Sequence, residues 1–567
     1  MFPEWIYDLC REESSVTSEL ASEPTSTPQA IADRLYNPRH GLCERCHGSE
    51  KDPGNTHLDL QQAYLCGKWG SKRPSDIFLQ IYHDVLCTLD PKPMVGLTSP
   101  GLMGSSGVVP LTIIAPTADI CRHMANCIVR AEKEVFLATN YWIFSRNSTI
   151  ITDALKELSI RAGKRESKVI VKIMYDRAQL SHDNDNLEMM VRLEGPIVDS
   201  FYDMAIISWN IKLKPMLPMI TSPAAAEKPP SFADHAVKRI SEKNPNLNQG
   251  SSNESNGREV SRAPVEHGEY SPDIISEAEK VNSSLKPRER ESRVECVTRY
   301  LNVIGRPEIT GNAPEWPKGD DMTPYILHPP HDPFPMALVC REPWSALNHG
   351  SIYTPQNVAF LSAIRNAKNS IFIQTPDLNA DRLLGPILDA LRRGVVVTCY
   401  LCLGYNDAGQ LLPFQNGINE MISNYLYNSL TSEEEKTRLR IYFYVGKDQT
   451  KPIHNKFKMR SCHIKLMIID EHIAIQGSGN LDTQSFFHSQ ESNVLLDSAE
   501  VCRSWLDGIR RNQNTGAFGL VSPEDGCWHD PLTGEVAKGS IGADPGMFSW
   551  IKGFVGAIKR VRGTGGF

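Results

Sequence analysis

Residues 461–491 read SCHIKLMIIDEHIAIQGSGNLDTQSFFHSQE, and this stretch decides how the C-terminal half of the chain is interpreted. His463 and Lys465 lie two positions apart, so on a strand their side chains project from the same face. Ile464, Leu466 and Ile468 alternate with them and are predicted to enter an apolar core. The alternation therefore predicts a strand that carries an imidazole and an ammonium group side by side.

A tight turn is predicted at Asp470, and the alternating apolar residues 473–475 predict a returning strand. Gly477 has no side chain, so we expect the backbone there to approach a ligand closely. The hydroxyl of Ser478 and the amide of Asn480 would then reach the same pocket as the imidazole and the ammonium group.

This set of side chains suits a phosphodiester. An imidazole can attack phosphorus or protonate the leaving oxygen, and a cation can neutralise the non-bridging oxygens. Lys465 supplies the charge, and Ser478 and Asn480 supply neutral donors. The second ring nitrogen of His463 needs an acceptor that fixes its tautomer, and Glu491 is the predicted acceptor.

An internal repeat relates the two halves of the chain. Residues 127–139 read CIVRAEKEVFLAT and residues 363–375 read AIRNAKNSIFIQT, at a constant offset of 236. Each copy predicts a helix that leads into a buried strand, and a second helix and strand follow each copy. The alternation predicts an α/β protein with two related α/β/α lobes, each with a mixed sheet covered by helices.

The pattern HxKxxxxD followed by GSxN is the signature of the phospholipase D superfamily, which this chain resembles. PMALVCREPW at 336–345 and the text of 354–380 and 403–422 resemble a two-lobe branch related to cardiolipin synthase. The resemblance covers about 105–215 and 320–515.

The resemblance implies a two-step exchange on a phospholipid without metal or cofactor. One histidine would form a phosphohistidine, the histidine of the other lobe would protonate the departing alcohol, and water or an alcohol would resolve the intermediate. His463 would be the acid and base, and Asp470 is more often structural than a phosphate contact. The implied residues are catalytic His463, Lys465 and Asp470, phosphate-binding Lys465, Ser478 and Asn480, and supporting Gly477 and Glu491.

The first half departs from the family because it lacks its own copy of the motif. In the second half, the 89 residues 405–493 between two predicted strands contain the motif, whereas the matching gap in the first half, 177–186, holds 10. The following strand is still recognisable within 186–205, so a block has been excised rather than eroded. Loss of a nucleophile and of half the phosphate clamp predicts impaired activity.

No other histidine supplies the missing pattern. Ser461 replaces the aspartate after His454 and Lys456, His235 and Lys238 are spaced wrongly, and His182 has no lysine partner. A homodimer could pair two copies of His463, although the residual first lobe would occupy that face. The sequence does not determine the oligomeric state.

Composition and charge narrow the classes of partner. The net charge of −7 gives no global positive field, so nucleic acid is an unlikely partner. No secretory signal and no apolar run of about 18 residues is present, which predicts an intracellular protein, cytoplasmic or peripheral to a membrane and not secreted. The 14 cysteines are predicted to be reduced thiols, and CxxCH at 43–47 fits a haem attachment, a zinc site or an ordinary loop.

The predicted organisation is, by residue number, a 1–104 N-terminal extension, a truncated first lobe at 105–215, a largely disordered linker at 216–320, a second lobe at 321–535 and a basic amphipathic tail at 536–567. The stretch 222–293 is rich in Pro, Ser, Asn, Glu and Lys, which suits disorder. In the tail, an apolar stripe beside Lys and Arg suits an anionic membrane surface, a helix docked on the protein, or disorder.

Three hypotheses about function follow from the sequence. The first is a phospholipid-directed phosphodiesterase or phosphatidyltransferase, favoured by the cardiolipin-synthase-like text and the tail. The second is a non-catalytic relative that still binds lipid head groups, and the third is a nuclease of the same superfamily.

Overall fold

The computed structural model describes residues 4–36, 57–142, 145–177, 186–209, 270–302, 309–346, 348–412, 415–457 and 460–544. The chain forms two compact units, of which unit 1 contains 1–118, 184–214 and 281–567, and unit 2 contains 119–183 and 215–280. The predicted first lobe, 105–215, contributes to both units. The CxxCH motif, most of the predicted linker and most of the amphipathic tail lie outside the described residues.

The strands of unit 1 are β1 (Gly104–Pro116), β4 (Leu187–Glu194), β5 (Tyr325–Leu327), β6 (Phe334–Arg341), β7 (Ser370–Gln374), β8 (Val396–Leu401), β9 (Leu439–Phe443), β10 (Leu466–Ile469), β11 (Ile473–Gly477) and β12 (Glu491–Asp497). Its helices are α1 (Glu4–Arg11), α2 (Val16–Ser22), α3 (Pro28–Tyr36), α4 (His57–Leu65), α5 (Asp76–Cys87), α6 (Pro100–Met103), α9 (Ile197–Ser208), α12 (Arg293–Leu301), α13 (Pro355–Asn366), α14 (Asp381–Arg392), α15 (Asp407–Gln410), α16 (Asn419–Asn428), α17 (Glu433–Arg438), α18 (Thr483–Phe487), α19 (Ala499–Asn512) and α20 (Thr515–Phe518). Unit 2 has β2 (Glu134–Tyr141), β3 (Ile170–Arg177) and α8 (Arg146–Lys164), most of α7 (Thr117–Arg130) and the first part of α11 (Ile274–Ser284).

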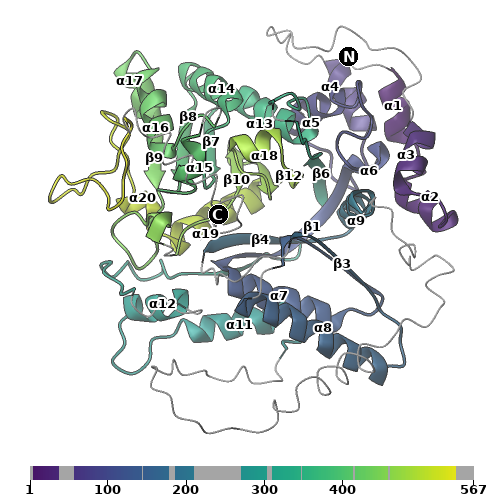
Figure 1. The fold of residues 1–567 in the computed structure, drawn as a ribbon, viewed down its shortest axis with the longest axis horizontal. Helices are drawn as coiled ribbons and strands as arrows, with labels where there is room; N and C mark the ends of the chain where they lie inside the picture. Colours follow the sequence, from purple (N-terminus) through teal and green to yellow (C-terminus); the bar gives the residue numbers. More distant parts are fainter. Residues whose placement is uncertain are drawn as a thin grey trace. The chain divides into compact units, whose positions relative to one another are not determined.

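Unit 1 is built on a ten-stranded mixed sheet in the order β4-β1-β6-β12-β11-β10-β7-β8-β9, with β5 also paired to β1 (Figure 1). The pairs β7–β8 and β8–β9 are parallel, and the other pairs are antiparallel. The predicted α/β class, with a mixed sheet and helices around it, is confirmed.

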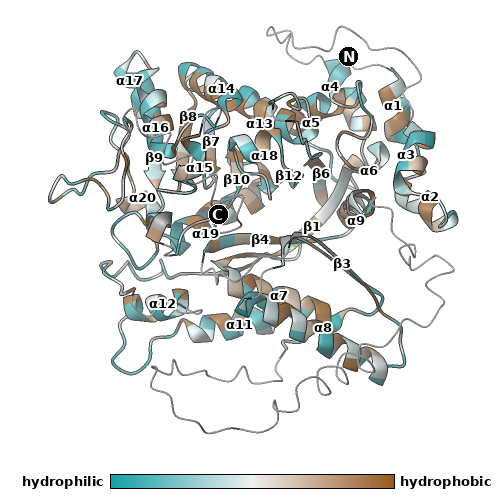
Figure 2. Cartoon of the chain, viewed as in Figure 1, coloured by the Kyte–Doolittle hydropathy of each residue, from teal (hydrophilic) through white to brown (hydrophobic). Residues whose placement is uncertain are grey.

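The predicted alternation is confirmed for Ile464, Leu466 and Ile468, which share one apolar core, but the strand begins at Leu466, so His463 and Lys465 precede it. Met467 and Ile469 enter the apolar core shared with α5, α13 and α14, whereas Leu466 and Ile468 enter the core shared with α19. In Figure 2 the strands of the sheet are largely brown and the surface helix α17 is largely teal. The hairpin that carries the motif therefore lies in the middle layer of unit 1, with an apolar core on each face.

The internal repeat is visible in the topology. In the first half α7 leads into β2 and α8 leads into β3, and in the second half α13 leads into β7 and α14 into β8. The two strands of each copy are parallel neighbours. The repeat therefore predicted these four helix-to-strand units correctly.

The two halves differ in what joins these parallel strands to the rest of the sheet. In the second half the hairpin β10–β11 lies between β7 and β12 and links them by hydrogen bonds. In the first half nine residues, 178–186, separate β3 from β4, whereas β10, its turn and β11 alone use the twelve residues 466–477. The segment is three residues shorter than that hairpin. In the described residues, β2 and β3 form a sheet of their own while β4 joins the sheet of unit 1.

The predicted disordered linker needs correction between 270 and 302, where α11 and α12 are helical. The side chain of Ser292 caps α12 in a capping box with Glu295, which stabilises a helix start that composition alone does not reveal. Val297, Tyr300 and neighbouring apolar residues of α12 are buried, so the segment contributes to a core. None of the described helices is long and apolar enough to cross a membrane.

Candidate functional site

The HxK segment lies in an extended stretch immediately before β10, and the start of β4 positions it. The backbone N–H of Leu187 donates to Ser461 O at 2.8 Å, and the N–H of His463 donates to Leu187 O at 2.8 Å. This parallel bridge places the residue after Leu187 beside the imidazole. A strand from the first half of the chain thus builds one side of the site.

The imidazole of His463 contacts a carboxylate and an ammonium group through the same nitrogen. Its Nδ1 lies 2.9 Å from Glu188 Oε1 and 2.6 Å from Lys465 Nζ. An ionised carboxylate can only accept, so the contact with Glu188 requires the proton on Nδ1. Lys465 then donates to His463 O, at 2.7 Å, and Nε2 remains available for chemistry. The side chain of His463 is 30% exposed, which leaves it accessible.

The opposite charges of Glu188 and Lys465 offset part of the free-energy cost of burying each of them. Burial raises the pKa of Glu188, but the charges of His463 and Lys465 and the hydrogen bond to His463 outweigh it, so the pKa falls below its ordinary value. Burial lowers the pKa of Lys465, against the attraction of Glu188 and Glu491, which raise it. The expected juxtaposition of His463 and Lys465 on one face is present.

Glu491 does not orient the imidazole, and this corrects the sequence prediction. Its Oε2 instead accepts from the Ser478 hydroxyl at 2.6 Å, across the antiparallel pair β11–β12. Burial raises the pKa of Glu491 to about 7, although hydrogen bonds from Ser478 and Ser485 lower it. The place that was predicted for Glu491 is taken by Glu188, because the start of β4 passes directly beside His463.

Gly477 is needed for strand packing rather than for approach of a ligand. A Cβ at this position would lie 2.3 Å from Ser492 O and 2.5 Å from Asn493 Cα, so any side chain would force β11 away from β12. The glycine therefore lets Ser478 lie beside Glu491.

Asn480 is not directed at the imidazole as a donor in this structure. Its Nδ2 donates to Asp482 Oδ2 at 3.0 Å, and its buried Oδ1 has no hydrogen-bond partner. Asp482 also accepts from Ser485 N as the cap of α18, so this part of the motif is held by the helix start.

Asp470 is structural, in line with the weaker role that the family resemblance implied for it. Its carboxylate accepts from three backbone N–H groups, those of Lys368 at 3.0 Å, Asn369 at 2.7 Å and Ser370 at 2.9 Å. It lies five residues beyond Lys465, which at roughly 3.3 Å per residue places it about 16 Å along the chain. Asp470 therefore ties the β10–β11 turn to the start of β7 and does not reach the reacting groups.

An aromatic ring covers one side of the His463 imidazole. The ring of Tyr405, which follows β8, stacks on that of His463 with centroids 5.7 Å apart and an angle of 22° between the planes. Tyr405 is 4% exposed, so it forms a fixed wall that limits rotation of the imidazole. Sequence reasoning did not identify this contact, which depends on the fold of the loop after β8.

Glu188 is the functional residue that sequence reasoning missed, although a signal for it exists. EMMVRLE from Glu188 aligns with ESNVLLD from Glu491, so Val191 matches Val494 and Glu194 matches Asp497. Both segments are strands that pair antiparallel with a strand preceding the repeat in their own half, β4 with β1 and β12 with β6. Extending the repeat beyond the two helix-to-strand units would have identified Glu188 as the counterpart of Glu491.

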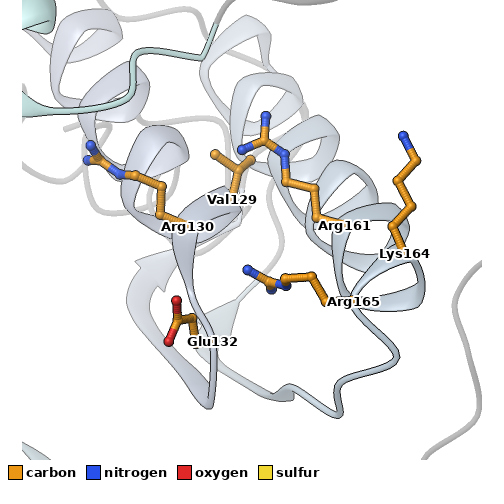
Figure 3. Close-up of a pocket in the computed structure, with 6 residues that line it drawn as sticks. All are labelled: Val129, Arg130, Glu132, Arg161, Lys164 and Arg165. Atoms are coloured by element: carbon orange, nitrogen blue, oxygen red, sulfur yellow. The ribbon is translucent and has the colours of Figure 1, made fainter.

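A separate pocket of about 500 Å³ lies in unit 2, and no predicted site residue lines it. Figure 3 shows its four cationic side chains, at the ends of α7 and α8, together with Val129 and Glu132. Cations at helix C-termini offset the helix dipole, which accounts for their concentration there. Within the described ranges, no group of three or more His, Cys, Asp or Glu side chains is arranged to hold a metal ion.

Comparison with known proteins places the site within a family. Residues 360–511 match the family described as "Cardiolipin synthase, PLD-like domain". Cardiolipin synthases from two strains of Clostridium perfringens are 24% and 25% identical over 188 residues, which is 32% of this chain and 33% of each relative. The matched part thus spans about a third of the length of these curated relatives.

Matches among solved structures include a phospholipase D family member, Nuc, from Salmonella typhimurium. It is 19% identical, with a TM-score of 0.22 over 32% of this chain and 95% of that chain. Phosphatidylserine synthase from Haemophilus influenzae is 11% identical, with a TM-score of 0.33 over 72% of this chain and 87% of that chain.

The mixed sheet with the His463–Lys465 pair and the matched residues 360–511 define a phospholipase D-like domain. The chain thus contains a phospholipase D-like domain, and the region matched is similar to cardiolipin synthases.

Proposed function

We propose that this protein is a phospholipase D-type phosphodiesterase or phosphatidyltransferase that acts on phospholipids at a membrane surface. The observation that carries the proposal is the contact of His463 with both Glu188 and Lys465. A carboxylate-oriented imidazole beside a cation can move a proton to the leaving oxygen while the charge on the phosphate is stabilised. The similarity to cardiolipin synthases supports a phospholipid as the substrate.

The same geometry supports weak turnover. In the described residues, the cation next to His463 is Lys465, and Glu188 and Glu491 both act on it. A phosphodiester anion would thus meet one ammonium group that is already partly neutralised by carboxylates. Since the segment between β3 and β4 is three residues shorter than the motif hairpin, water attack assisted by His463 is the step that this chain can supply most directly.

A test of the proposal uses the purified full chain and vesicles that contain phosphatidylglycerol. Release of phosphatidic acid or formation of cardiolipin is followed by mass spectrometry, with EDTA present to remove adventitious metal. His463→Asn should lower the rate by at least about 10², the usual contribution of a positioned acid or base. His472→Asn is the matched control, because His472 lies on the same hairpin and pairs with Asp497 at 3.0 Å.

A non-catalytic lipid-binding role is the second candidate, favoured by the single motif hairpin in the described sheet. It predicts vesicle binding without product, and Lys465→Ala should weaken that binding. Cleavage of DNA in EDTA without lipid turnover would instead support the nuclease hypothesis, which the net charge of −7 disfavours.

A further inference from the structure

A second constellation of nucleophile, base and acid lies in unit 2, apart from the phosphodiester site. His123 and Cys127 lie on α7 one turn apart, so their side chains share a face of the helix. His123 Nε2 is 3.4 Å from Cys127 Sγ, and His123 Nδ1 is 2.5 Å from Glu277 Oε2 on α11. The imidazole thus bridges a thiol and a carboxylate.

Arg130 completes the cluster. Its Nη2 lies 3.1 Å from Glu277 Oε1 and 3.9 Å from Cys127 Sγ. His123 is 2% exposed and Glu277 is 3% exposed, whereas Cys127 is partly exposed and takes part in no disulfide. The base and its orienting carboxylate are therefore shielded from water, while the sulfur is accessible.

The positions of the protons in this cluster favour an ion pair between His123 and Cys127. Glu277 can only accept, so the proton on His123 Nδ1 points to it, and the remaining proton is shared between Nε2 and the sulfur. Burial lowers the pKa of His123, but the hydrogen bonds to Cys127 and Glu277 and their charges raise it overall to about 9. At neutral pH the imidazolium and the thiolate are then both stabilised, with Arg130 adding a second positive charge beside the sulfur.

We propose that Cys127 is a nucleophilic thiolate and a site of oxidative modification by small hydroperoxides, with His123 as its proton partner and Glu277 as a positioning residue. The sulfur attacks one oxygen of the peroxide, an S–O bond forms, and the O–O bond breaks. The leaving hydroxide or alkoxide takes the proton from His123 Nε2 and departs as water or an alcohol. The sulfur is oxidised by two electrons to a sulfenic acid, and the peroxide is reduced.

The first experiment measures alkylation of the native full chain by iodoacetamide between pH 5.5 and 9, with the label at each cysteine quantified by peptide mass spectrometry. Cys121 is the internal control, because it is also partly exposed and lies on α7. An ordinary thiol with a pKa near 8.5 is only about 1% ionised at pH 6.5, and the lower intrinsic nucleophilicity of an acidic thiolate offsets part of the gain. We expect Cys127 to react about 10-fold faster than Cys121 at pH 6.5, with the ratio falling toward 1 near pH 9.

His123→Asn should abolish this advantage at pH 6.5 and leave reaction at pH 9 intact. Glu277→Gln should reduce the advantage of Cys127 over Cys121 at pH 6.5, because it removes the carboxylate that orients His123 but leaves His123 beside the sulfur. Buried Cys502 in unit 1 and the rate at Cys121 report whether each variant is still folded. If a variant unfolds, the comparison of Cys127 with Cys121 in the native chain still decides the question.

In the second experiment hydrogen peroxide is added with dimedone, which traps sulfenic acids, and the adduct is expected at Cys127 in the native chain and not in His123→Asn. Equal labelling of Cys127 and Cys121 at every pH, absence of label at Cys127 in the native chain, or a pH profile unchanged by His123→Asn would each overturn the proposal.

Discussion

Glu188 and Glu491 are counterparts in the repeat, yet they have opposite electrostatic environments. The pKa of Glu188 is lowered because His463 and Lys465 together outweigh its burial. Burial raises the pKa of Glu491 to about 7. One carboxylate is therefore a permanent anion at neutral pH, and the other changes its charge there.

Glu188→Gln should lower kcat by roughly 10- to 100-fold, a part of the contribution of a positioned acid or base. The amide can still accept from Nδ1, but it no longer stabilises the imidazolium with a full negative charge. We expect KM to stay close to that of the unmodified chain, so that the loss appears in kcat alone. A matching loss of thermal stability with no effect on kcat would mean that Glu188 only supports the fold.

Glu491→Gln tests the carboxylate that titrates near neutrality. Above pH 7 the ionised Glu491 competes with the phosphate for Lys465, so we expect KM to rise with pH in the unmodified chain and to stay flat in the variant. The neutral form is favoured in the folded state, so stability falls as pH rises from 4.5 to about 7, by roughly 3 kcal/mol at 1.36 kcal/mol per pH unit. Urea unfolding at pH 5 and pH 8 measures this loss, which the variant should not show.

At the scale of elements, the β10–β11 hairpin is fixed at both ends. At its turn, Asp470 and Glu471 have φ values of 51° and 52°, a left-handed pair typical of type I′ turns. The carboxylate of Asp470 offsets this strain by accepting from three backbone N–H groups at the start of β7. At its other end, the hairpin positions Ser478 beside Glu491.

Asp470→Asn should destabilise the protein by about 1–3 kcal/mol, because it weakens charge-assisted hydrogen bonds to three backbone N–H groups, of which that of Ser370 is partly buried. Thermal unfolding measures the change. Glu471→Gln is the matched control, because the Glu471 side chain is exposed and its backbone has the same left-handed conformation as that of Asp470. We expect kcat well below the melting temperature to stay within about 3-fold. A loss of kcat near 10² with unchanged thermal stability would instead assign Asp470 to the chemistry.

The whole molecule consists of two units with different sheets. The pair β7–β8 lies inside the ten-stranded sheet, whereas β2–β3 forms a two-stranded sheet of its own in unit 2. Val171 and Tyr175 of β3 are 38% and 53% exposed. Two-stranded sheets are marginal without additional packing, which α7 and α8 provide on one face.

Hydrogen exchange should distinguish the pair β2–β3 from its counterpart β7–β8. We expect the amides of β2 and β3 to exchange at least about 10² faster than those of β7 and β8, because local opening of unit 2 needs less free energy than opening of the ten-stranded sheet. Exchange measured by mass spectrometry on peptides covering 134–141 and 370–374 tests this. Equal protection would mean that the two units open together.

The sequence by itself determined the elements that depend on neighbours along the chain. The period-2 alternation around Ile464 placed His463 and Lys465 on one face, and the repeat predicted the helix-to-strand units, because both follow from local backbone geometry. The tertiary structure decided which groups meet across large separations: Glu188 rather than Glu491 orients His463, and Glu277 meets His123. Such partners depend on which strand or helix passes alongside, and that is set by sheet order and packing rather than by spacing in the sequence.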